Sequence, residues 1–320
     1  MAKKKKRRSQ APVALVYFLT LLLALSLAGG VSYYLLKKYE VFKPGVSDSK
    51  ADSTRSVGIL FARVNDTGDF QDMCVMRIDP FNKEITIIPQ SDVTKTSDGK
   101  TYKELMNSGG IELLRKKAAE NLGGINIDFY ATVTNSAFEQ VADLMGGMSY
   151  TAPQELYHIS QESSKDDISL QKGDLVTLSG RQIVNLASYD IFNDKKAGNL
   201  TFLSSALEQV INNGFRQATV TKDNLYNIYE IITSGSSTNL TKDAFNEIRR
   251  YLEVMLDERD IPAKSLTPQG SWNSDYTAFT MKSDYISQVA DTFGVKKQAA
   301  VTAKITEPPA RSPDESSSGQ

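Results

Sequence analysis

A long stretch without a charged side chain near the N-terminus constrains this chain more than any other feature. Residues Ala11 to Leu36 are almost wholly apolar. As a helix, roughly 26 residues at ~1.5 Å each would reach ~39 Å, which exceeds the ~30 Å hydrocarbon core of a bilayer. Tyr34 suits the membrane interface and Lys37 closes the span. We therefore predict an N-terminal transmembrane helix over 11–36.

A basic run precedes this stretch and predicts its orientation. Lys3–Arg8 carries six positive charges, so the formal net charge of −1 leaves about −7 on the rest of the chain. Basic residues beside a membrane span stay in the cytoplasm. We therefore expect a cytoplasmic N-terminus, a single-pass anchor in the cell membrane and an extracytoplasmic main domain. Its acidic character argues against nucleic acid as a partner.

A cleaved signal peptide is the competing interpretation. Ser26-Leu27-Ala28 offers a small-x-small cleavage site after an apolar region. The apolar run nevertheless continues from Val31 to Leu36, beyond that site. This continuation favours an uncleaved anchor.

Composition divides the whole chain into segments. Polar residues with Pro44 and Gly45 follow the apolar stretch and suggest a stalk, whereas the C-terminal end is rich in Pro and Ser and suggests disorder. The predicted segments are a basic tail (1–10), a transmembrane helix (11–36), a stalk (37–55), an extracytoplasmic domain (56–296) and a disordered tail (297–320).

Short apolar runs alternate with helical patterns in the domain, which favours an α/β fold with a central mixed sheet flanked by helices. The predicted strands are Val57–Leu60, Met73–Ile78 and Glu84–Ile88. The predicted helices are Ile111–Asn121, one capped by Ser136 with Glu139, one capped by Ser179 with Gln182, Phe202–Ile211, Lys222–Thr233 capped by Thr221, Lys242–Leu256 capped by Thr241, and a last one capped by Ser283 that runs to Phe293.

Cysteine and histidine offer little chemistry. Cys74 is the only cysteine and lies in an apolar run, so no intrachain disulfide forms and a core position is expected. His158 is the only histidine. A lone histidine cannot build a histidine-based zinc site, and we assign it no catalytic role.

Several segments, in order, resemble the LytR-CpsA-Psr family of bacterial cell-envelope proteins. The most specific is Phe138–Met148, which is similar to the family pattern F-x-x-x-V-D-x-L-G-G-V. Gly109–Leu114 with Asn121–Tyr130 resembles a helix, loop and strand of the family, and Leu170–Gln182 resembles its entry to a later helix. Thr267–Gly294 resembles its closing segment. The resemblance implies a three-layer sandwich and transfer of glycopolymers from a polyprenyl-pyrophosphate carrier to peptidoglycan.

The departures concern the residues that would hold the pyrophosphate. The family pattern R-S-D falls on Phe70-Gln71-Asp72, and I-P-R-D falls on Ile88-Pro89-Gln90-Ser91, with Asp92 one place later. The later arginines fall on Asp190, Asn199 and Phe202. Guanidinium groups bind phosphate oxygens bidentately, so their loss weakens pyrophosphate binding. This chain therefore resembles a divergent member that lacks the family's arginines.

The resemblance leaves candidate site residues and two functions. Asp72 and Asp92 are the candidate catalytic residues, and Asp72 is the candidate ligand of a magnesium ion that the resemblance implies. The favoured function is a catalytically degenerate envelope protein that binds a polyprenyl lipid or cell-wall glycopolymer and assists its attachment. The alternative is an active magnesium-dependent transferase or pyrophosphatase with a rebuilt site. That site would use Asp72, Asp92, Arg63, Lys95, Lys103, Lys195 and Lys196. A transcriptional attenuator is disfavoured because no helix-turn-helix pattern is present.

Overall fold

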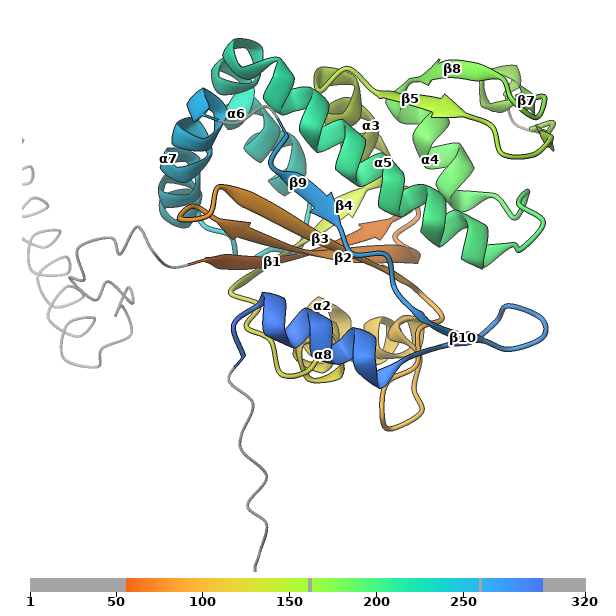
Figure 1. Cartoon of the computed structure of the whole chain (residues 1–320), viewed down its shortest axis with the longest axis horizontal. Coiled ribbons are helices and arrows are strands. Elements are labelled where there is room, and N and C mark those ends of the chain that lie inside the picture. The colour runs from red at the N-terminus through yellow and green to blue at the C-terminus, as the bar shows by residue number, and fades with distance from the viewer. Residues whose placement is uncertain (1–55, 161–162, 259–260, 296–320) are drawn as a thin grey trace, which may run out of the picture. The chain divides into compact units, whose positions relative to one another are not determined.

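The computed structural model describes residues 56–160, 163–258 and 261–295. Strands and helices alternate along most of this part of the chain (Figure 1). In chain order they are β1 (Val57–Val64), β2 (Phe70–Asp79), β3 (Glu84–Ser91), α2 (Tyr102–Asn121), β4 (Phe129–Thr134), α3 (Asn135–Leu144), β5 (Met148–Thr151), β6 (Leu156–His158), η1 (Ser164–Asp166), β7 (Ile168–Leu170), β8 (Leu175–Leu178), α4 (Gly180–Ser188), α5 (Lys196–Arg216), α6 (Ala218–Thr233), α7 (Lys242–Glu258), β9 (Ala263–Ser265), β10 (Gly270–Trp272), β11 (Phe279–Met281) and α8 (Ser283–Thr292).

A five-stranded mixed sheet with the order β4-β1-β2-β3-β9 forms the centre. β1, β2 and β3 pair antiparallel, whereas β4 lies parallel to β1 and β9 parallel to β3. The three predicted strands are therefore neighbours in one sheet, as expected. Each is longer than its apolar run, because β1 continues through Arg63 and β2 begins before Asp72.

The two faces of the sheet carry separate cores. Side chains alternate along a strand, so Leu60 and Ala62 of β1 point to one face while Ile59 and Phe61 point to the other. The first face packs against α2 and α8. The second faces α3, α5, α6 and α7 (Figure 1). This arrangement confirms the predicted α/β fold with a mixed sheet flanked by helices.

Two predicted helix caps are present. Ser179 accepts from the backbone N–H of Gln182, whose side chain in turn accepts from the Ser179 N–H, so the predicted capping box begins α4. Thr241 Oγ1 accepts from the Ala244 N–H at 3.2 Å at the start of α7.

Three predicted caps are wrong. Thr134, rather than Ser136, caps α3: its backbone is extended and its Oγ1 accepts from the Ala137 N–H. Thr221 lies inside α6 and donates to the Gly214 carbonyl, 2.6 Å away. Ser283 is the first residue of α8, whose N-cap position is Lys282 without a side-chain bond. None of the three hydroxyls makes the capping hydrogen bond that its spacing indicated.

The helix predicted over Ile111–Asn121 is the second part of α2. Thr101 and Glu104 form a capping box that begins α2 upstream of the prediction. Gly110, at φ +65°, interrupts the helical backbone within it. A glycine tolerates this left-handed conformation because it has no Cβ that would clash. The apolar pattern predicted only the part of α2 that follows this interruption.

Side chains cover the outer edges of the sheet. Asn212 of α5 bonds both the N–H and the carbonyl of Ala263 on β9, at 2.9 and 3.0 Å. On the opposite edge, Asn239 Oδ1 accepts from the Tyr130 N–H of β4 at 2.7 Å. These amides satisfy backbone groups that edge strands would otherwise expose.

The predicted N-terminal segments lie outside the described residues. The basic tail, the transmembrane helix over 11–36, the stalk over 37–55 and the tail over 297–320 belong to parts of the chain that the structure does not describe. No helix in the described part is both long and apolar enough to cross a membrane.

Candidate functional site

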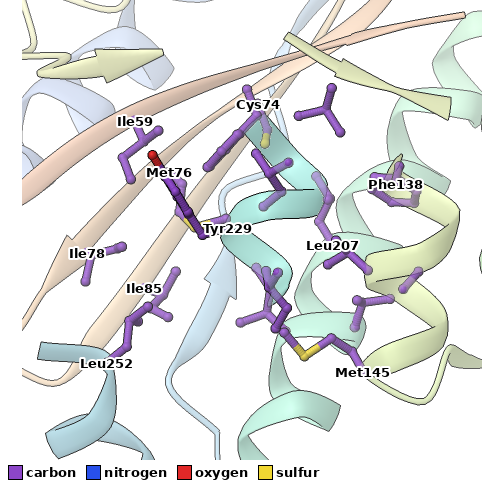
Figure 2. A pocket seen from close by; sticks show the side chains of 18 of the residues that line it. Ile59, Cys74, Met76, Ile78, Ile85, Phe138, Met145, Leu207, Tyr229 and Leu252 are labelled. Atoms are coloured by element: carbon purple, nitrogen blue, oxygen red, sulfur yellow. The ribbon is translucent and has the colours of Figure 1, made fainter. Parts of the chain in front are cut away.

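An apolar cavity of about 230 Å³ lies between the sheet and the helices α3, α5, α6 and α7. Figure 2 shows side chains from strands and helices converging on it. Those labelled are Ile59, Cys74, Met76, Ile78, Ile85, Phe138, Met145, Leu207, Tyr229 and Leu252. Their chemistry suits an apolar chain and offers few hydrogen bonds to water.

An ion pair lies at the wall of this cavity. Arg63 of β1 and Asp72 of β2 face each other in the sheet, and both line the cavity. Arg63 Nε donates to both carboxylate oxygens of Asp72 at 3.1 Å, and Nη2 donates to Oδ2. Only 4% of Arg63 and 9% of Asp72 are exposed.

Two further side chains accept hydrogen bonds from Arg63. Its Nη1 donates to Asn135 Oδ1 at 2.8 Å and to Ser188 Oγ at 2.9 Å. Asn135 is the first residue of α3 and Ser188 the last of α4. The guanidinium therefore joins two strands and two helices, and each of its three nitrogens has a partner.

A small polar pocket adjoins the ion pair. It shares Arg63, Asp72 and Leu203 with the apolar cavity. On its other side, Lys196 Nζ donates to Asp92 Oδ1 at 2.8 Å. The complete lining is Arg63, Gln71, Asp72, Ser91, Asp92, Ala187, Ser188, Asp190, Lys196, Asn199, Leu200 and Leu203.

The N-terminal turn of α5 forms one wall of this pocket. Asn199 Nδ2 donates to the carbonyls of Leu186 and Tyr189, both at 2.9 Å. These bonds fix the orientation of the amide. Its Oδ1 is buried and accepts no hydrogen bond from the described residues. A buried carbonyl oxygen without a donor costs free energy, so a ligand that donates there would relieve it.

The candidate residues of the sequence divide into two groups. Asp72, Asp92, Arg63 and Lys196 all line the polar pocket, together with Asp190 and Asn199. Lys95, Lys103 and Lys195 do not line it. The first group gives the pocket its charge.

Three of the positions aligned with family arginines lie away from the pocket. Gln90 pairs with Met73, and Phe70 belongs to the same core as Met73, on the α2 and α8 face of the sheet. Phe202 belongs to the core on the other face. An arginine at Phe70 or Gln90 would therefore not converge with Arg63.

The surroundings of Asp72 do not fit a magnesium ion. Both of its carboxylate oxygens accept from Arg63. Within the described part of the chain, no three His, Cys, Asp or Glu side chains are grouped closely enough to hold a metal. Magnesium takes six oxygen ligands in near-octahedral geometry. The assignment of Asp72 as a metal ligand stays a prediction without support from this geometry.

Cys74 and His158 have structural surroundings. Cys74 is buried in the cavity wall, as expected for a core residue. Burial, with a smaller contribution from the charge of Asp72, raises the pKa of its thiol to about 12. His158 stacks on the ring of Tyr189 with centroids 3.9 Å apart.

Sequence reasoning missed Asn135 and Ser188. Asn135 is separated from Arg63 by 72 positions and Ser188 by 125. No local pattern marks either residue as a partner of an arginine. The one sequence feature that could have pointed to them is their place in the predicted elements. Asn135 lies at a strand–helix junction, and Ser188 lies at the end of a capped helix.

Comparison with known proteins agrees with this fold. A family model, described as the LytR_cpsA_psr family, matches residues 65–293. No curated protein matches the sequence.

Solved structures with the same fold cover about three quarters of the chain. A putative transcription regulator from Eubacterium siraeum has a TM-score of 0.65 at 15% identity, over 76% of this chain and 93% of its own. TagV from B. subtilis has 0.59 at 19% identity, over 75% and 96%. A structure of TagT bound to LIIa-WTA has 0.56 at 14% identity, over 76% and 92%. At these identities the likeness shows the fold.

Proposed function

The chain belongs to the LytR-CpsA-Psr family, which the match over residues 65–293 establishes, and from this premise we propose that it is a catalytically degenerate cell-envelope protein. In this role it holds the chain of a polyprenyl lipid and assists the attachment of lipid-linked glycopolymers to peptidoglycan. TagT, which shares the fold, has been solved with a bound wall teichoic acid ligand. A cell-wall glycopolymer is accordingly the proposed partner here.

The apolar cavity carries this proposal. Its volume of about 230 Å³ lies directly under the sheet, and it ends at charged groups. A lipid chain would bury apolar surface there, at about 25 cal/mol per Å². The head would then meet the polar pocket beyond Arg63 and Asp72.

The ion pairs of the polar pocket support the loss of catalysis. Arg63 already donates to Asp72, Asn135 and Ser188, so its N–H groups are engaged within the protein. Lys196 donates to Asp92. Binding a pyrophosphate through Arg63 would require its pair with Asp72 to break, and a buried carboxylate left without its cation is strongly unfavourable.

The test uses the purified full chain in detergent. We expect a radiolabelled polyprenol to bind in an equilibrium assay, and polyprenyl pyrophosphate to be hydrolysed no faster than in buffer, with or without magnesium. Leu207→Trp should fill the cavity and abolish binding. Val254→Trp, on an exposed part of α7, is the matched control and should bind normally. Absence of lipid binding by the unmodified chain would refute the proposal.

The alternative is an active transferase or pyrophosphatase with a rebuilt site. It is favoured by the gathering of Asp72, Asp92, Arg63 and Lys196 at one pocket. Magnesium-dependent turnover by the unmodified chain, abolished by Asp72→Ala, would establish it in place of the degenerate role.

The proposed location is the outer face of the cell membrane. A tail over 1–10, an anchor over 11–36, a stalk over 37–55 and a domain over 56–296 would place the cavity outside the cytoplasm. The support is the basic run Lys3–Arg8 before an uncharged stretch. Protease added to spheroplasts should digest the domain and spare the N-terminal tail. Protection of the domain would overturn this orientation.

A further inference from the structure

The polar pocket at the end of the cavity carries more negative than positive charge. Its ionisable lining residues are the carboxylates Asp72, Asp92 and Asp190 and the cations Arg63 and Lys196. Counted as ionised, they sum to one net negative charge. Asp190 is exposed and has neither an ion pair nor a hydrogen bond within the described residues. A pyrophosphate entering this pocket would meet a net negative charge.

The donors of the two cations are largely engaged within the protein. Asp72 takes the Nε and Nη2 donors of Arg63, and Nη1 serves two side chains. Lys196 is about one-third exposed and keeps donors beyond its bond to Asp92. A single ammonium can donate to one oxygen of a ligand, but it cannot satisfy the many oxygens of a pyrophosphate.

The neutral groups of the pocket include an acceptor without a donor. Asn199 Oδ1 is buried, its residue is 9% exposed, and it accepts nothing from the described residues. The Nδ2 bonds to Leu186 and Tyr189 prevent the amide from turning to present a donor instead. A phosphate oxygen would be repelled by this carbonyl oxygen, whereas a hydroxyl would donate to it.

We propose that the lipid held by this protein carries an uncharged hydroxyl head, as in a long-chain polyprenol, and that this hydroxyl donates to Asn199 Oδ1. The inference rests on the proposed function, because it requires a lipid chain in the cavity. The same hydroxyl accepts from Lys196 Nζ, so donor and acceptor are both satisfied. The protein then selects the free alcohol over its phosphorylated forms.

The experiment compares three ligands of equal chain length on the full chain reconstituted in phosphatidylcholine nanodiscs. They are a polyprenol, its acetate ester and its pyrophosphate, each competing with a photoreactive polyprenol for covalent labelling. The acetate keeps an acceptor but lacks the hydroxyl donor. We expect the polyprenol to compete about tenfold or more better than either, since each alternative leaves a buried acceptor or charge without a partner.

A charge variant tests the pocket itself. Asp190→Arg changes the pocket from one net negative to one net positive charge and should improve competition by the pyrophosphate about tenfold, relative to the polyprenol. Asp223→Arg makes the same change on an exposed site of α6 outside the pocket, and should leave the ratio unchanged.

The outcomes separate this inference from the proposed function. If the pyrophosphate competes as well as the polyprenol, the inference fails while lipid binding stands. If the acetate competes as well as the polyprenol, donation to Asn199 is refuted. If no ligand protects against labelling, the proposed function fails and the inference fails with it.

Discussion

Arg63 and Asp72 lie directly opposite each other on β1 and β2, and the guanidinium donates to both oxygens of the carboxylate. Both side chains are buried between the apolar cavity and the polar pocket. Desolvation makes such a pair costly to bury, but removing one partner is costlier still because a charge is left unpaired.

Arg63→Met should therefore destabilise the domain by about 3–5 kcal/mol, since it leaves Asp72 buried without a cation. Urea unfolding followed by circular dichroism measures the change. The double variant Arg63→Met/Asp72→Leu removes both charges and should be more stable than the single variant. A single variant as stable as the parent would contradict the buried pairing.

Thr134→Ala should destabilise the domain by about 1 kcal/mol, because the Oγ1 of Thr134 accepts from the Ala137 N–H at the start of α3. Ser136→Ala, two residues along the same helix, is the matched control and should change stability by less than about 0.5 kcal/mol. Thermal unfolding of both variants distinguishes the two hydroxyls. Equal effects would mean that Thr134 does not act as the cap.

Cys74 should resist alkylation at pH 8 in the folded chain. Burial raises the pKa of the thiol to about 12, and only the thiolate reacts. Labelling by iodoacetamide, followed by mass spectrometry, should be at least about tenfold slower in the native than in the urea-unfolded protein. Equal rates in both states would place Cys74 outside a closed core.

The pair formed by Arg181 and Asp166 predicts a loss of stability in acid. The hydrogen bond from Arg181 lowers the pKa of Asp166 below its ordinary value of 3.8. A lowered pKa contributes stability above the unfolded value, and that contribution disappears as pH falls through the folded value. The parent protein and Arg181→Met should differ in their unfolding midpoints at pH 6. This difference should shrink as the pH falls below 3.8.

The control for this pH series is Arg250→Met. Arg250 is exposed on α7 and donates to the Asn246 carbonyl, which does not titrate. Its effect on the midpoint should not change with pH. A pH-independent difference for Arg181→Met as well would refute the contribution of the Asp166 carboxylate.

The sequence predicted the sheet better than the site. Apolar runs located three central strands, because burial of a strand requires them. The same rule placed the strand ends too early, since it treats charged residues as exposed. Arg63 is buried in β1 because its partners Asn135 and Ser188 come from distant helices. Such partners are visible only once the chain has folded.

Strand alternation limits what the alignment of Gln90 with a family arginine can imply. Side chains alternate along β3, and Gln90 shares its face with Ile88. Ser91 shares the opposite face with Ile87 and lines the polar pocket. Because side chains alternate along the strand, the side chain of Gln90 points to the face of the sheet opposite the polar pocket. The position of a residue in a family motif therefore indicates its role only when the sheet face to which its side chain points is also known.

The amide side chains that cover the sheet edges limit how this protein can bind other polypeptides. Asn212 occupies backbone groups of β9, and Asn239 occupies one of β4. A peptide or a second copy of the chain that tried to extend the sheet would first have to displace these side chains. Recognition of an extended polypeptide by strand addition is thus disfavoured at both borders. The described domain is thereby protected against edge-to-edge aggregation when other copies of the chain fold close by.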